Sequence, residues 1–166
     1  MRKTSLSAAA CLASLMLGFS PALADDKVNT GYFGGVAILG YDPVAYFTEG
    51  KPMKGSEEFS YDWLGTPWHF ASRKHQELFQ NEPVKYAPQF GGYCAGEIAA
   101  EGITVNIDPE AWKIIDGKLY MVYNKGYDEQ FAAEARDLVP KAEAYWPELE
   151  AKLEQGKFFL GQSRPV

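Results

Sequence analysis

Residues 59–71 read FSYDWLGTPWHFA, and this stretch predicts the first piece of regular structure. Aromatic residues occupy every second position from Phe59 to Trp63, which is the period of two expected of a half-buried β-strand. Residues 65–67, Gly-Thr-Pro, supply a turn, and residues 68–71 supply the returning strand. The stretch therefore predicts a β-hairpin with one aromatic face.

Turn and capping signals outside this hairpin predict the rest of the fold. Asp116-Gly117 suits a type I′ turn, so a second hairpin is expected from residues 112–115 and 118–123. Helices are expected from Pro43 after the cap Asp42, over 73–80 after the cap Ser72, over 127 to about 138, and in pieces that start at Pro140 and Pro147. The sequence thus predicts an α+β fold of small antiparallel hairpins packed with short helices, plus a C-terminal helical extension.

The first 24 residues have the three parts of a secretory signal peptide. A basic start at Arg2 and Lys3 precedes an apolar run from Leu6 to Phe19, and Ala22-Leu23-Ala24 suits the signal peptidase. The apolar run is shorter than the roughly 20 residues that a membrane-spanning helix needs. We therefore expect cleavage after Ala24, a periplasmic location and no stable membrane span in the mature protein.

Composition describes the mature chain as a small acidic domain. Loss of Arg2 and Lys3 leaves 14 basic residues against 22 acidic ones, so the net charge moves from −6 to −8. This excess repels a phosphate backbone, so we expect no nucleic-acid partner. Residues 25–35 are expected to form a flexible leader, and residues 36–166 are expected to form one domain that includes the C-terminal helices.

Cys94 is the one cysteine left after cleavage, because Cys11 lies in the signal peptide. No internal disulfide can form, so the thiol is either shielded or used. A buried cysteine that fills space and a reactive thiol both fit this pattern. Gly91-Gly92 beside it would let backbone amides approach the sulfur, although paired glycines are also ordinary turn formers.

Several motifs in fixed order carry a family resemblance. They are Gly40-Tyr41-Asp42-Pro43-Val44-Ala45-Tyr46-Phe47, then Gly65, Trp68-His69-Phe70-Ala71-Ser72, Phe79, Pro83 and Tyr86, and last Gly91-Gly92-Tyr93-Cys94-Ala95. This pattern, over roughly residues 36 to 125, resembles the YHS domain family in its exported proteobacterial form. The resemblance implies a compact α+β core similar in shape to treble-clef-like metal-binding modules, in a family often found beside metal-transport and metal-dependent oxygenase modules. A shared fold alone implies no function for this chain.

The chain departs from the metal-associated members of that family at two positions. Those members show a pattern with one cysteine after Asp-Pro-Val and another before the serine that follows the second hairpin strand. Ala45 and Ala71 stand at these positions here. The usual two-thiol site is therefore absent from this sequence.

Ligand softness favours a noncatalytic binding module for a soft metal ion of the copper type, or for another small ligand, centred on Cys94. His69 and His75 are the expected imidazole ligands, and Met53 or Met121 would add a thioether. A histidine on the apolar face of a helix, such as His75, is more often a packed core residue than a ligand, and a solvated or hydrogen-bonded His69 is the alternative for the second imidazole.

Two alternatives to this binding module stay open. Cys94 would be the nucleophile of a thiol-dependent redox protein, which needs an external reductant because the chain has no resolving cysteine. Alternatively, the aromatic hairpin faces would dock a periplasmic protein. An entirely buried Cys94 with no adjacent pocket would favour this interaction domain.

Overall fold

The computed structural model describes residues 27–32 and 34–155, and the predicted signal peptide lies outside them. In chain order the elements are η1 (Ala37–Gly40), α1 (Ala45–Thr48), β1 (Ser56–Trp63), β2 (Thr66–Phe70), α2 (Arg73–Asn81), α3 (Pro83–Tyr86), η2 (Gln89–Gly92), α4 (Ala95–Glu101), β3 (Trp112–Ile115), β4 (Lys118–Met121) and α5 (Tyr127–Glu154), where η denotes a 3-10 helix. β1 pairs with β2 and β3 pairs with β4, each pair forming a two-stranded antiparallel sheet. The predicted α+β class with two hairpins is confirmed.

Both hairpins turn through two residues with positive φ. The φ angles are 51° and 70° in Leu64-Gly65 and 51° and 74° in Asp116-Gly117. Positive φ at both central residues is the geometry of a type I′ turn, whose twist matches that of the strands it joins. The second turn lies where it is predicted. The first begins one residue earlier than predicted, because Trp63 pairs with Thr66, and Pro67 lies inside β2.

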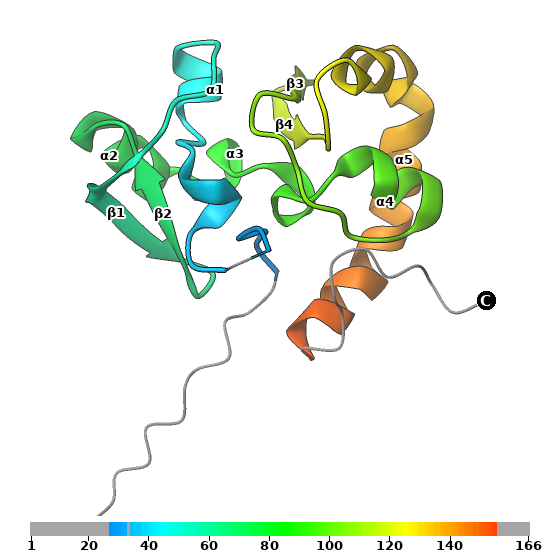
Figure 1. The fold of residues 1–166 in the computed structure, drawn as a ribbon, viewed down its shortest axis with the longest axis horizontal. Helices are drawn as coiled ribbons and strands as arrows, with labels where there is room; N and C mark the ends of the chain where they lie inside the picture. Colours follow the sequence, from blue (N-terminus) through cyan, green and yellow to red (C-terminus); the bar gives the residue numbers. More distant parts are fainter. Residues whose placement is uncertain (1–26, 33, 156–166) are drawn as a thin grey trace, which may run out of the picture.

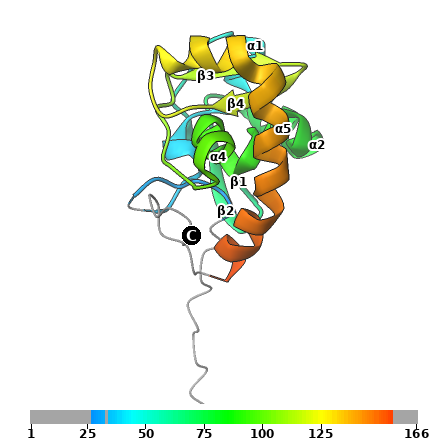
Figure 2. The ribbon, with the colours of Figure 1, turned by 90° about the vertical axis from the view of Figure 1, so that its right-hand side faces the viewer.

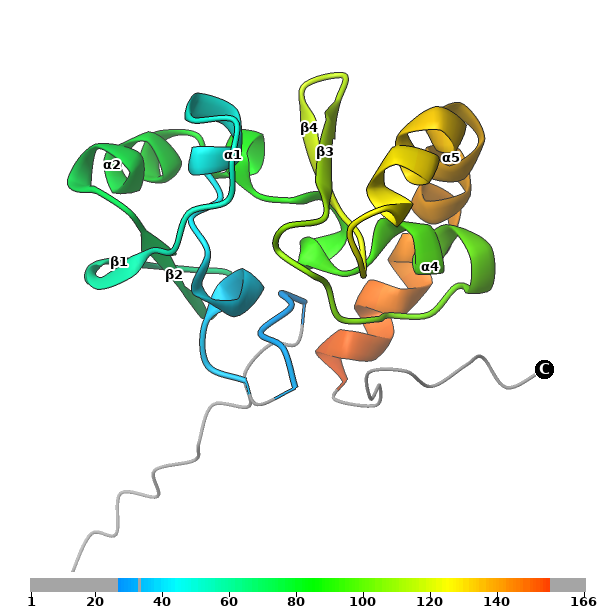
Figure 3. The ribbon, with the colours of Figure 1, turned by 45° about the horizontal axis from the view of Figure 1, so that its top comes forward.

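The same order of elements occurs twice along the chain. The first half runs η1, α1, β1, β2, α2, and after α3 the second half runs η2, α4, β3, β4, α5. Figure 1 shows the first half on the left and the second half on the right, and Figure 3 shows the same division from a tilted view. In each half the second strand packs against the 3-10 helix of that half, β2 on η1 and β4 on η2.

Each 3-10 helix contains a run of left-handed backbone. The φ angles are 42°, 56° and 77° over residues 38–40, and 55°, 60° and 79° over residues 90–92. Each run is followed by an extended tyrosine, Tyr41 in one half and Tyr93 in the other. The two halves therefore share a local backbone shape, although most of the residues that adopt it differ.

Asn29 connects these two left-handed runs. Its side-chain Nδ2 donates hydrogen bonds to the Gly92 carbonyl at 3.0 Å and to Oδ1 of Asn106 at 3.1 Å. Its backbone NH donates to the Gly91 carbonyl at 2.8 Å, and its carbonyl accepts from the Ile38 NH at 2.7 Å. Because Asn29 is fully buried, these bonds are shielded from water.

Buried side chains from both halves form one connected core. Trp68 and Phe79 lie in it from the first half, and Phe131 lies in it from the second. Val28 belongs to the same core with only 2% of its surface exposed. Val28 and Asn29 fall within the stretch expected to be a flexible leader, yet burial and hydrogen bonding hold both in place.

The C-terminal helix is longer than predicted. α5 is a single helix of 28 residues, and both Pro140 and Pro147 lie inside it. The expected separate pieces are therefore wrong, because a proline removes one helical hydrogen bond and bends a helix that packing can still hold together. α5 packs along α4, as Figure 2 shows. Among the described helices, none combines the length and apolar character that a membrane crossing requires.

Candidate functional site

Cys94 connects η2 to α4, and its side chain is fully buried. Burial raises the pKa of the Cys94 thiol to about 11, from an ordinary value of 9.0. Backbone NH groups of Glu97, Gly96 and Tyr123 point toward the sulfur and oppose this rise without cancelling it. The thiol is therefore protonated at neutral pH, which weakens it both as a nucleophile and as a metal ligand.

Backbone and aromatic rings close the region around Cys94. Its backbone pairs with that of Met121, one of the two methionines expected to assist a metal. The ring of Tyr127 lies so close to Gly96 that a side chain at Gly96 would overlap it. Tyr127 in turn contacts Tyr123, with 5.0 Å between the ring centroids. Access to the sulfur therefore requires movement of this cover.

Asp42 and His75 form a buried pair that joins α1, β2 and α2. Oδ2 of the fully buried Asp42 lies 2.6 Å from Nδ1 of His75 and accepts the NH of Ala71 at 2.8 Å. Oδ1 of Asp42 accepts the NH groups of Val44 at 2.8 Å and Ala45 at 3.3 Å. The carboxylate thus caps α1 as predicted, and it also occupies one ring nitrogen of His75.

The other ring nitrogen of His75 faces α1. Nε2 lies 3.3 Å from the hydroxyl of Thr48 and 3.7 Å from a carboxylate oxygen of Glu49. Asp42, His75 and Thr48 therefore follow the order of an acid–base–nucleophile triad. The Thr48 hydroxyl, however, donates to the Val44 carbonyl at 3.2 Å, so its proton is directed to the backbone. This arrangement describes a hydrogen-bonded structural histidine, the packed alternative for His75.

Ala45 and Ala71 are the two positions at which the predicted resemblance leads one to expect cysteine. Their backbone NH groups donate to the two oxygens of the same Asp42 carboxylate. The fold therefore brings the two positions to one place, where this chain has a buried carboxylate and no thiol.

The three predicted metal ligands lie in different surroundings. His75 is bonded to Asp42, Cys94 is enclosed at the start of α4, and His69 lies on β2 beside a surface hollow. Within residues 27–32 and 34–155, no group of three or more His, Cys, Asp or Glu side chains is placed to hold a metal ion. The copper site stays a prediction to which the described residues contribute no ligand cluster.

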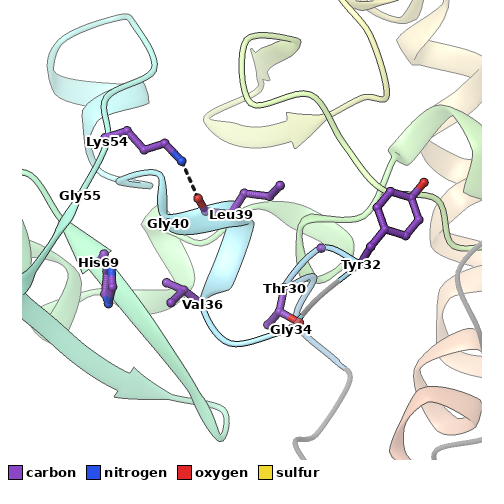
Figure 4. Close-up of a pocket in the computed structure, with 10 residues that line it drawn as sticks. Thr30, Tyr32, Gly34, Val36, Leu39, Gly40, Lys54, Gly55 and His69 are labelled. Carbon is purple, nitrogen blue, oxygen red and sulfur yellow. Dashed lines mark hydrogen bonds between the residues drawn. The ribbon is translucent and has the colours of Figure 1, made fainter.

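The hollow beside His69 has a volume of about 460 Å³ and is shown in Figure 4. Its lining comes from the segment before η1, from η1, from residues 54–55 just before β1, and from β2. The described lining residues are Thr30, Gly31, Tyr32, Gly34, Val36, Leu39, Gly40, Lys54, Gly55 and His69. A Cβ on Gly40 would lie 4.0 Å from Nδ1 of His69, and one on Gly55 would overlap the His69 backbone. Glycine at these two positions therefore leaves space beside the imidazole and permits the close crossing.

The charge at the hollow comes from Lys54. Its ammonium donates a hydrogen bond to the Leu39 carbonyl at 2.8 Å, marked in Figure 4, and lies 4.1 Å from the centroid of the Tyr41 ring. The described residues that line the hollow include no carboxylate. The imidazole of His69 makes no hydrogen bond to another described side chain. The hollow thus offers one fixed cation and one available imidazole.

Sequence reasoning found His69 but missed its surroundings. Thr30, Gly31 and Gly34 belong to the stretch interpreted as a leader, and Lys54 has no neighbouring signal in the sequence. Lys54 reaches the hollow because its backbone bridges to Tyr41. No local pattern reveals such a contact, since it depends on how the first hairpin folds back onto η1.

Comparison with known proteins assigns no role to these residues. No family model matches the chain, and no curated protein or solved structure matches it either. The resemblance to the YHS family therefore stays a prediction from motifs. The fold and site define a class, a small α+β domain with a buried Asp–His pair and a glycine-walled hollow, whose chemistry has to be argued from its own side chains.

Proposed function

We propose that this chain is an exported, noncatalytic binding domain whose small ligand occupies the hollow beside His69. The hollow itself carries the proposal. Its volume of about 460 Å³ lies within the roughly 300–1,000 Å³ of ordinary small-molecule sites. It combines apolar walls with a few polar groups, which is the composition that binds and orients a small molecule.

The walls of the hollow are held in place before any ligand binds. Ile38, Leu39 and Gly40 keep left-handed backbone, which is unfavourable for a β-branched residue and persists only when its surroundings fix it. Asp42 lies two residues after Gly40 and accepts the NH of Ala71, the residue that follows β2. The two sides of the hollow are thus tied together, which lowers the ordering cost of binding.

A site centred on Cys94 gains less support from the geometry. Thiolate chemistry, whether with copper or with an oxidant, needs deprotonation of a thiol whose pKa is raised to about 11. It also needs local opening of the structure, because the Cys94 side chain is fully buried. Ligand binding beside His69 requires neither step.

The two histidines of the chain allow a direct test by NMR. Their ring signals can be followed while the mature protein is titrated with a set of small-molecule fragments. We expect some fragments to shift the ring signals of His69, which lines the hollow, and to leave those of His75, which is bonded to Asp42, in place.

A hollow-filling variant supplies the control. Val36 lines the hollow from extended backbone that accepts larger side chains, so Val36→Phe should abolish the His69 shifts while the His75 signals confirm folding. The proposal is wrong if no fragment shifts His69, or if Val36→Phe binds as the wild type does. Tight Cu(I) binding that is lost in Cys94→Ser would instead establish the soft-metal site.

A further inference from the structure

The hollow beside His69 differs in charge from the rest of the molecule. The chain as a whole carries a net charge of −6, whereas the full charge on the described lining of this hollow is the single positive one of Lys54. A second hollow, between the β3–β4 turn and α5, is lined by Asp116, Glu134 and Asp137 with Arg136. Of these two hollows, only the one beside His69 is lined by an excess of positive charge.

A hydrogen bond holds the Lys54 ammonium in position, but no described carboxylate neutralises its charge. Other lysines form ion pairs, such as Lys113 with Glu129 and Lys152 with Glu148. Among the described residues, no carboxylate oxygen lies within 4.0 Å of Nζ of Lys54, which is the limit for an ion pair. Its ammonium has three NH groups and donates one to the Leu39 carbonyl, which fixes its position and leaves donors for a ligand.

His69 supplies a second donor in the same hollow. A neutral imidazole carries one NH donor, and a protonated one carries two donors and a positive charge. We infer that the ligand of this hollow is a small anion bearing a carboxylate or phosphate group, held by the Lys54 ammonium and the His69 ring. This inference rests on the proposed function and gives the chemical class of its ligand.

Three probes of one shape and different charge test the inference. Benzoate, benzyl alcohol and benzylammonium share an aromatic ring, and each is titrated into the mature protein while the ring signals of His69 and His75 are followed. We expect benzoate to shift His69 with the lowest Kd and to leave His75 in place. Higher salt should weaken benzoate binding, because Lys54 is exposed. A parallel titration with inorganic phosphate separates phosphate from carboxylate recognition.

Charge variants locate the effect on Lys54. Lys54→Gln keeps a donor for the Leu39 carbonyl and removes the charge, so it should weaken benzoate binding about tenfold. Lys54→Arg should retain the binding. The matched control Lys51→Gln removes the same charge from an exposed lysine outside the hollow and should have no effect.

The outcomes separate this inference from the proposed function. If benzyl alcohol or benzylammonium shifts His69 as strongly as benzoate does, or if Lys54→Gln binds benzoate as the wild type does, the inference is wrong and the hollow remains a binding site. If none of the probes or fragments shifts His69, the proposed function itself fails. Unchanged His75 signals show in each case that the variant is folded.

Discussion

Two opposing effects act on the pKa of the Cys94 thiol, because backbone NH groups favour its thiolate and burial favours its protonated form. Burial prevails and raises the pKa to about 11, against 9.0 for an ordinary cysteine. The folded state therefore holds this proton more tightly than the unfolded state does. The resulting stability is fully present below pH 9 and is lost as the pH rises through about 11.

We expect the free energy of unfolding to fall more steeply between pH 8 and pH 11 in the wild type than in Cys94→Ala. The thiol contributes up to about 3 kcal/mol of this fall, from a difference of about two pKa units. Urea unfolding at several pH values measures it, and Cys94→Ala is the reference because it keeps the tyrosines and removes only the thiol. Parallel curves for the two proteins would show that the thiol is not shielded as its burial indicates.

At the scale of elements, the two hairpins place different residues in the same left-handed conformation. Leu64 has a φ of 51° in the first turn, and Asp116 has the same φ in the second. Left-handed backbone costs most residues about 1–2 kcal/mol, whereas Asn and Asp tolerate it. With 47% of its surface exposed, Leu64 recovers only part of this cost by packing.

Leu64→Asn should therefore raise the free energy of unfolding by about 1 kcal/mol. The reciprocal change Asp116→Leu should lower it by a similar amount, about 1 kcal/mol, because it introduces the same unfavourable conformation into the second turn. Urea unfolding of both variants checks the pair. A loss of stability in Leu64→Asn would mean that the apolar surroundings of Leu64, which lines a hollow together with Trp63 and Trp68, outweigh the backbone cost.

Local signals predicted the elements well where the relevant contact is itself local. Ser72 caps α2 and accepts the NH of His75 at 3.2 Å, and Asp116-Gly117 forms the predicted turn. Contacts between distant segments could not be predicted in this way. The Asp42–His75 pair and the position of Lys54 beside η1 depend on tertiary folding, and so does the continuous α5, which packing on α4 maintains through both prolines.

At the scale of the whole molecule, Asn29 adds hydrogen bonds between the two halves to the core that they share. Asn29→Asp removes the donor that Gly92 and Asn106 accept and places a carboxylate against their oxygens. We expect it to lower the free energy of unfolding by about 3 kcal/mol, measured by urea unfolding. The control is Asn106→Asp, which keeps the Oδ1 acceptor for Asn29 and should cost less than about 1 kcal/mol.

Equal losses in the two variants would contradict a specific role for Asn29. The repeated order of elements makes this role important, since each half builds its own 3-10 helix, hairpin and helix. The sequence shows no repeat, because different residues adopt the shared backbone shape. Similar architecture thus arises twice from local turn chemistry, and a shared core that contains the buried Asn29 amide joins the two copies.

The burial of Asn29 also affects how fast this residue deamidates. Asparagine deamidates when the following backbone nitrogen, here that of Thr30, attacks the side-chain carbonyl and expels ammonia. Water then opens the resulting succinimide to give isoaspartate or aspartate, and aspartate is the residue that Asn29→Asp introduces. Both ends of the Asn29 amide are hydrogen-bonded and the residue is fully buried, so the attack has to wait for local opening. The rate of deamidation at Asn29 would therefore report how often the structure opens locally. Each deamidated molecule would open more readily than the original one.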